Sequence, residues 1–191
     1  MNNFKLESAD ILVTVNDRQD PFSVAKRWCV GPYNHVFMYL GEVGILVSRR
    51  QHRILRFPML FESNGRGVVI QSLPNRYGQK VVVMRLKPGF QDRIPRIVEE
   101  AIKLASSPQA YYDYMCVPLN IIPRVFHDKF GMPLPVKYDR NEQMVCSEAC
   151  AEPCWRAEVP VLPENVVPLP GDFVVLSGIL DAVNQGILSE D

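Results

Sequence analysis

The sequence predicts an α+β fold in which a mostly antiparallel sheet or half-barrel packs against helices. Short runs rich in β-branched and aromatic residues alternate with Gly, Pro and Asn turns, a pattern typical of hairpin-connected strands. The clearest helix spans residues 91–107, where apolar side chains recur at helical spacing. The length of 191 residues indicates one domain, 1–191, with a core large enough to fold without disulfides.

The remaining elements follow from local signals. Strands are expected at residues 11–15, 33–41, 44–47, 54–57, 59–62, 67–71, 80–86 and 171–176. Helices are expected at 21–30, from Cys146 to a break at Pro153, and at 178–187. The apolar, proline-punctuated stretch 117–136 is predicted to be a lid or pocket wall beside Cys146, with a short helix packed on the core as an equal alternative.

Charge and composition limit the classes of function. The formal net charge is zero, with 21 basic and 21 acidic side chains, so a nucleic-acid partner is not expected. No apolar run approaches the ~20 residues of a membrane span, and the first residues lack the apolar core of a secretory signal. Five cysteines without short paired spacings fit a reduced compartment, which favours a cytoplasmic protein.

The densest basic cluster lies between two apolar runs. Its members are Arg49, Arg50, His52, Arg53 and Arg56. A solvated hairpin connection is the favoured interpretation, and an anion site is the alternative.

Cys146 is the strongest candidate for a reacting group. It follows the apolar run Gln143, Met144 and Val145 and opens an Ala-rich segment that should be helical. A thiol at a helix N-terminus faces backbone N–H groups and the positive end of the helix dipole, which favour the nucleophilic thiolate. The alternative is a buried structural cysteine, the commonest state of a free thiol.

A thiol nucleophile also needs a base and a group that orients the base. His35 is the candidate base because it alone among the three histidines lies in a strand-like run, and His127 is the reserve candidate. Glu62 ends another apolar run and could accept the second imidazole N–H, with Glu42 and Asp113 as rivals. The backbone N–H of Cys146 would hold the oxyanion.

The order of these motifs resembles a known family. Ala9-Asp10-Ile11-Leu12, Asn34-His35-Val36, Phe61-Glu62-Ser63, Tyr112-Asp113-Tyr114 and Val145-Cys146-Ser147-Glu148 occur in the order found in the permuted papain-fold amidases. These form the YiiX-like branch of the NlpC-type cysteine peptidase superfamily, in which the His-bearing strand precedes the Cys-bearing helix. Leu169-Pro170-Gly171-Asp172-Phe173 is similar to the closing turn and strand of that family. Two departures are Ala9 where the family usually has Gly and Asn34 where it usually has Ser.

The resemblance implies a circularly permuted papain-like fold and a catalytic set of Cys146, His35, Glu62 and Tyr112, the last as a further oxyanion donor. It implies cleavage of an amide or ester bond in a peptide, acyl-amino acid or acyl-lipid through an acyl-Cys146 intermediate. The substrate would be a small molecule, lipid or peptide with an apolar acyl part. Acyl transfer through the same thioester and an inactive binding module on the same fold are the alternatives.

No cofactor or metal is expected. Cys146, Cys150 and Cys154 follow one another at intervals of four residues, which invites a metal interpretation. Three thiolates on one helix face give poor tetrahedral geometry, and no histidine is close in sequence.

Overall fold

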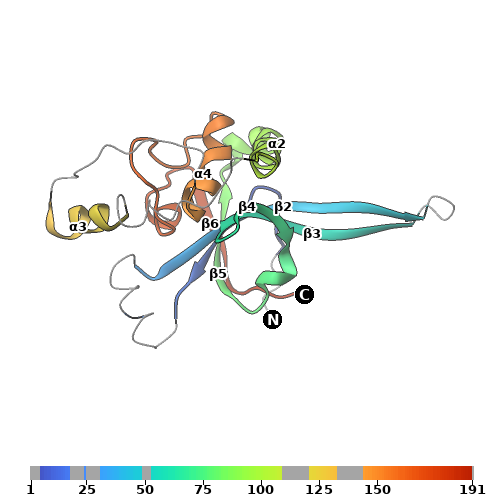
Figure 1. Cartoon of the computed structure of the whole chain (residues 1–191), viewed down its shortest axis with the longest axis horizontal. Coiled ribbons are helices and arrows are strands. Elements are labelled where there is room, and N and C mark those ends of the chain that lie inside the picture. The colour runs from blue at the N-terminus through green and yellow to red at the C-terminus, as the bar shows by residue number, and fades with distance from the viewer. Residues whose placement is uncertain are drawn as a thin grey trace.

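The structure is a computed structural model that describes residues 5–17, 24, 31–48, 53–108, 121–132 and 144–190. Its centre is one six-stranded antiparallel sheet with the strand order β4-β3-β2-β1-β5-β6 (Figure 1). The strands are β1 Ile11–Val15, β2 Tyr33–Ser48, β3 Arg53–Asn64, β4 Gly67–Ser72, β5 Lys80–Leu86 and β6 Leu180–Ile187.

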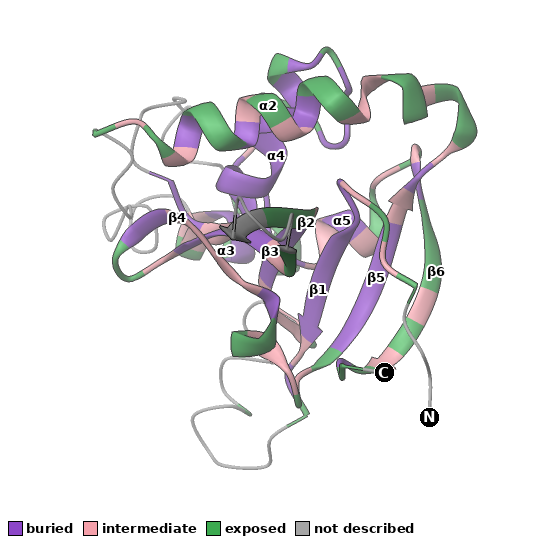
Figure 2. Cartoon of the chain, turned by 90° about the vertical axis from the view of Figure 1, so that its right-hand side faces the viewer, coloured by how far each residue is buried: buried purple, intermediate pink, exposed green. Residues whose placement is uncertain are grey.

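Two of the helices, α2 and α4, pack over one face of this sheet. The helical elements are η1 Leu73–Arg76, η2 Pro88–Arg93, α2 Ile94–Ala105, α3 Ile122–Phe130, α4 Cys146–Arg156 and α5 Asp172–Val175. Helix α2 buries Ile97, Ala101 and Leu104, one face at helical spacing, and leaves its other face exposed (Figure 2). It packs on α4, which in turn contacts β2 and β3. The predicted α+β class, an antiparallel sheet against helices, is confirmed.

Side-chain alternation along β2 supplies both cores of the molecule. Val36 and Met38 join the larger cluster beneath α2 and α4, whereas Phe37 and Tyr39 join a smaller cluster that includes Leu73 of η1. Each fully buried side chain of this size stabilises the fold by about 1.5–3 kcal/mol. Because both faces are covered, β2 is fixed rigidly at the end where His35 lies.

Strands β2 and β3 are longer than the rest of the sheet. The register shifts between Tyr39 and Gly41, a β-bulge at which Gly41 has a φ of 101°. A Cβ atom at Gly41 would also lie 2.6 Å from the Ser8 hydroxyl, so the backbone favours glycine there and a larger residue would also displace the Ser8 side chain. Beyond this bulge the two strands leave the body as a projecting ribbon (Figure 1).

Three predicted elements differ from the structure. Residues 171–176 contain a short helix, α5, in place of the predicted strand. Only Phe173 of this helix is buried, and the segment does not pair with any strand of the sheet, so its β-favouring composition does not produce a strand. The predicted helix at 178–187 is instead largely strand β6, Leu180–Ile187, because these residues pair along the open edge of β5. Helix α4 continues through Pro153 to Arg156, since the buried surroundings of residues 147–155 hold it together. The predicted helix at 21–30 lies outside the described residues except for residue 24.

Candidate active site

His35 lies near the start of β2, opposite Thr14 of β1. The Thr14 hydroxyl hydrogen-bonds the carbonyl oxygen of His35 at 3.1 Å and the Asn34 side chain at 2.5 Å, which fixes the backbone at this point. The imidazole lies beside the ring of buried Phe37, with 6.2 Å between ring centroids. The ring is partly exposed, so a substrate can reach it.

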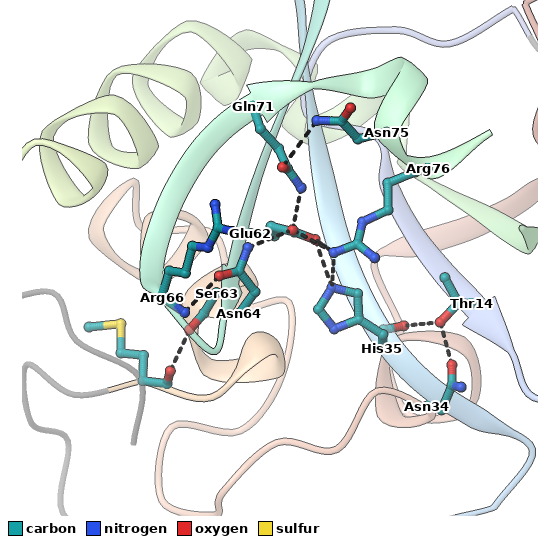
Figure 3. Close-up of polar contacts among 11 residues, drawn as sticks. Thr14, Asn34, His35, Glu62, Ser63, Asn64, Arg66, Gln71, Asn75 and Arg76 are labelled. Carbon is teal, nitrogen blue, oxygen red and sulfur yellow. Dashed lines mark hydrogen bonds and ion pairs between the residues drawn. The ribbon is translucent and has the colours of Figure 1, made fainter. Parts of the chain in front are cut away.

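Glu62 of β3 is fully buried and meets this imidazole directly. Its Oε2 atom lies 2.7 Å from His35 Nε2 (Figure 3). The same carboxylate accepts hydrogen bonds from Asn64 Nδ2 at 3.0 Å, from Gln71 Nε2 and from Arg76 Nη2 at 2.5 Å. Such a set of donors holds both carboxylate oxygens and therefore fixes the ring orientation of His35.

The electrostatics of this pair favour its ionised form. Burial alone would raise the pKa of Glu62, but hydrogen bonds from His35 and Arg76 lower the pKa to about 2. Burial alone would lower the pKa of His35, but the Cys146 thiolate and the Glu62 carboxylate raise it to about 9. The imidazolium is therefore stabilised between two negative groups.

Arg76, from η1, is a neighbour that the sequence did not point to. Its Nη2 atom is 3.4 Å from His35 Nε2, but a guanidinium has no acceptor and Nε2 donates to Glu62, so this contact is not a hydrogen bond. Two cations lie this close because the Glu62 carboxylate binds both. The guanidinium also lies over the Phe37 ring, 5.9 Å from its centroid.

Cys146 is the first residue of α4, directly after the extended residue Val145. Three contacts fix this helix start: Ser63 Oγ donates to the Met144 carbonyl at 2.6 Å, Val145 N–H donates to Glu148 Oε2 at 2.8 Å, and Ser147 Oγ donates to the Pro168 carbonyl at 2.6 Å. The Cys146 side chain is partly exposed, and it lies close enough to the His35 ring to raise the pKa of the imidazole. Nε2 of the ring contacts Glu62, so we expect Nδ1 to be the nitrogen that serves the thiol.

The other thiols of α4 are in different surroundings. Cys150 and Cys154 are buried, and burial raises the pKa of Cys150 well above its ordinary value and that of Cys154 to about 12. Neither is therefore suited to act as a nucleophile or a metal ligand. Cys29 and Cys116 lie outside the described residues.

The structure brings together three of the four predicted site residues, Cys146, His35 and Glu62. Tyr112 and the rival Asp113 lie outside the described residues, as does His52. The reserve histidine, His127, is on the exposed side of α3, where Nδ1 hydrogen-bonds the Met132 carbonyl at 2.6 Å. The rival Glu42 is half-exposed and pairs with Arg56 at 3.6 Å.

Arg76, Gln71 and Asn64 are the site residues that sequence reasoning missed. Asn64 could have been found, because it follows Glu62 by two residues and so shares its side of β3. No spacing pattern links Arg76 to Glu62, because a hairpin and a turn separate them.

The motif at Ala9-Asp10 has a structural role. Ala9 has a φ of 67°, in the left-handed region that favours glycine. Asp10 is buried and binds Arg85 through both oxygens, at 2.8 and 2.7 Å. This pair ties β1 to β5, and it does not contact the Cys146 site.

A pocket of about 390 Å³ lies between the start of β2, helix α3 and helix α5. Tyr33, Leu169 and Leu176 supply much of its apolar lining, and the buried Arg124 of α3 lies in its wall. Arg124 Nη1 donates to Asp172 Oδ2 at 2.7 Å and to the Val167 carbonyl, next to the Pro168 carbonyl that Ser147 holds. The wall formed by α3 is thus connected to the residue after Cys146.

Among the described residues, no group of three or more His, Cys, Asp or Glu side chains is placed to hold a metal ion. Within the same part of the chain, no helix is both long and apolar enough to span a bilayer.

The fold of this chain is similar to that of a protein of known structure. No protein-family model and no curated protein matches the chain. The chain is similar in fold to the crystal structure of metalloprotein yiiX (DUF1105) from Escherichia coli O157:H7. The alignment covers 97% of this chain and 100% of that one, with 15% identity and a TM-score of 0.49.

Proposed function

We propose that this protein is a cysteine-dependent hydrolase that cleaves an amide or ester bond through an acyl-Cys146 intermediate. One observation carries the proposal: the His35 imidazole lies between the Glu62 carboxylate, at 2.7 Å, and the thiol that begins α4. Nucleophile, base and orienting acid in mutual contact are the arrangement of a catalytic triad.

The reaction follows from these contacts. The Cys146 thiolate attacks the substrate carbonyl carbon, and the resulting oxyanion accepts a hydrogen bond from the Cys146 backbone N–H. The His35 imidazolium gives its proton to the leaving amine or alcohol as the carbon–heteroatom bond breaks, which leaves a thioester. His35 then takes a proton from water, the hydroxide attacks the thioester, and the thiolate departs.

Glu62 and Arg76 support these steps without touching the substrate. The Glu62 carboxylate fixes the His35 tautomer and stabilises the imidazolium. Arg76 keeps the carboxylate ionised and in place. Both act as positioning residues.

The pocket beside α3 suits the apolar acyl part of the substrate. Its lining is mainly apolar, and it lies next to the strand that carries His35. We therefore expect kcat/KM for a series of p-nitrophenyl esters to rise as the acyl chain lengthens from two carbons. Leu176→Asp should flatten this dependence, whereas the same change at exposed Val183 of β6 should not. Equal rates for all chain lengths in the wild type would contradict the pocket assignment.

Acyl-enzyme trapping tests the proposed activity. The purified chain is mixed with p-nitrophenyl esters and acylated amino acid amides, and intact and peptide mass spectra are recorded. We expect an acyl adduct on Cys146 and its loss in Cys146→Ala, whereas Cys154→Ala should keep the adduct. Added amine acceptors separate hydrolysis from acyl transfer by the product formed. Absence of any adduct and of turnover across the library would favour the binding-module alternative.

A further inference from the structure

The projecting ribbon of β2 and β3 is an arm in which, among the described residues, these two strands pair only with each other. Residues 42–48 pair with residues 53–58, whereas β1 pairs with β2 only up to Met38 and β4 pairs with β3 only from Met59. The arm extends well away from the sheet and helices (Figure 1). Two-stranded ribbons are marginally stable in water, so a long one is usually held by a further surface.

One face of this arm is apolar and exposed. Val43 and Phe57 are directly opposite each other, and Leu55 follows Phe57 by two residues on the same face. Their side chains are 49%, 38% and 39% exposed. On the opposite face, Glu42 pairs with Arg56, and Ile54 is also exposed. Apolar side chains gathered on a projecting element indicate an interaction site.

The charge of the same segment identifies the kind of partner. Residues 42–58, which span the arm, contain four arginines, one histidine and a single acidic residue, Glu42, in a chain whose formal net charge is zero. This segment therefore carries a formal charge of +3 at neutral pH, with the histidine uncharged. An apolar face combined with a local excess of arginine is complementary to anionic lipid headgroups above acyl chains.

We propose that this arm docks the protein on an anionic membrane surface. Val43, Leu55 and Phe57 enter the boundary between headgroups and acyl chains, and the net positive charge of the segment attracts the anionic headgroups. The apolar face distinguishes this surface from a purely basic patch, which would suit a nucleic acid. The inference does not depend on the activity proposed for Cys146, since it concerns residues that do not contact that site.

Vesicle sedimentation with the full chain tests this proposal. The probes are large vesicles of phosphatidylcholine alone and of phosphatidylcholine with an equal amount of phosphatidylglycerol. We expect the protein to pellet with the anionic vesicles and to be released as salt is raised. Arg53→Gln with Arg56→Gln should weaken the partition about 30-fold, from about 5-fold per basic residue at the surface. Leu55→Ser with Phe57→Ser should also weaken it.

Matched variants elsewhere control for charge and folding. Lys80→Gln with Arg96→Gln removes two positive charges from the body of the protein and should leave vesicle binding within about 2-fold. Circular dichroism and thermal unfolding check that each variant is folded. Equal binding to neutral vesicles, or no binding to anionic ones, would overturn the proposal. A concentration-dependent dimer that Leu55→Ser with Phe57→Ser disperses would also overturn it and assign the arm to a second copy of the chain.

Discussion

Glu62 is enclosed by a histidine on one side and an arginine on the other, and the two neighbours share one carboxylate. The Arg76 contact lowers the pKa of Glu62. The positive charge of Arg76 also weakens the electrostatic stabilisation that Glu62 gives to the His35 imidazolium. The balance still favours the imidazolium, because the pKa of His35 is raised to about 9. Glu62 therefore acts both on the fold and on the reactivity of the site.

Glu62→Gln should lower turnover substantially and change its pH dependence. An amide still contacts the imidazole but no longer stabilises the imidazolium, so the pKa of His35 falls and the alkaline limb of kcat/KM moves to lower pH. The loss should be smaller than the ~10⁴-fold measured when the orienting carboxylate of a serine protease is changed to an amide, because a thiol needs less help to ionise. The measurement is kcat/KM from pH 5 to 10.

Glu42→Gln is the control for this change, because that carboxylate is half-exposed and remote from His35. It should leave both the rate and the pH profile close to those of the wild type. Wild-type rates in Glu62→Gln, together with a loss in Asp113→Asn, would assign the orienting position to Asp113.

Arg76→Gln should weaken the fold in a manner that depends on pH. The folded-state pKa of Glu62, about 2, lies below its ordinary value of 4.5, so the stability from the ionised carboxylate is present above about pH 4.5 and is lost as the pH falls through about 2. Without Arg76 the folded-state pKa of Glu62 rises toward its ordinary value. The ionised carboxylate then contributes less to the free energy of unfolding, so less is lost on acidification. Urea unfolding at a series of pH values should show that the wild type has a higher free energy of unfolding than Arg76→Gln, and that this difference shrinks as the pH falls from 4.5 to 2.

The exposed Arg66 provides the comparison for this experiment, because no side-chain contact to Glu62 is seen for it. Arg66→Gln should change the free energy of unfolding little at any pH. Parallel curves for wild type and Arg76→Gln across the whole range would show that Arg76 does not hold the Glu62 carboxylate ionised.

Among the elements, α4 shows most clearly how packing outweighs local preference. Pro153 lacks the N–H that would bond the preceding turn, a loss of about 3 kcal/mol in an isolated helix. The helix nonetheless continues, and it ends in a Schellman motif in which Val159 N–H reaches the Cys154 carbonyl at 2.9 Å and Glu158 N–H reaches the Trp155 carbonyl at 2.9 Å. Such an ending places Glu158 in the left-handed region, with a φ of 62°.

Glu158→Gly should therefore be more stable than Glu158→Ala by about 1 kcal/mol, because glycine adopts this conformation without strain. Both variants lose the exposed ion pairs of Glu158 with Arg93 and Arg96, so the comparison isolates the backbone term. Urea unfolding of the two variants gives the difference directly. Equal stabilities would mean that the helix end relaxes when the side chain is removed.

The strands that could be predicted are those with short, nearly continuous runs of apolar and β-branched residues. In β1 and β5 nearly every residue is buried and β-branched or apolar, and both were placed correctly from sequence. Residues 180–187 are different: their apolar residues fit either period, and the free edge of β5, far away in sequence, decides for a strand. The strand predicted at 171–176 was also wrong. The composition of these residues favours a strand, but they do not pair with the sheet and form helix α5 instead.

For the whole molecule, the candidate site exists only where three distant segments meet. His35 comes from β2, Glu62 from β3 and Cys146 from α4, and helix α4 contacts both strands. Motif order could indicate these three residues, because each carries a local sequence signal. Arg76 could not be found in this way, because its role depends on how η1 folds back over β2 and β3.

The most direct test of this account is whether Cys146 alone reacts as a thiolate in the folded protein. Thiols at helix N-termini beside an imidazolium have pKa values of roughly 3.5–7.5, whereas burial raises the pKa values of Cys150 and Cys154. Limited iodoacetamide labelling at about pH 6, quantified by peptide mass spectrometry, should place the label on Cys146 and lose most of it in His35→Ala. Even labelling across the five cysteines, or Cys146 labelling unchanged by His35→Ala, would contradict the assignment of Cys146 and His35 as a reactive pair.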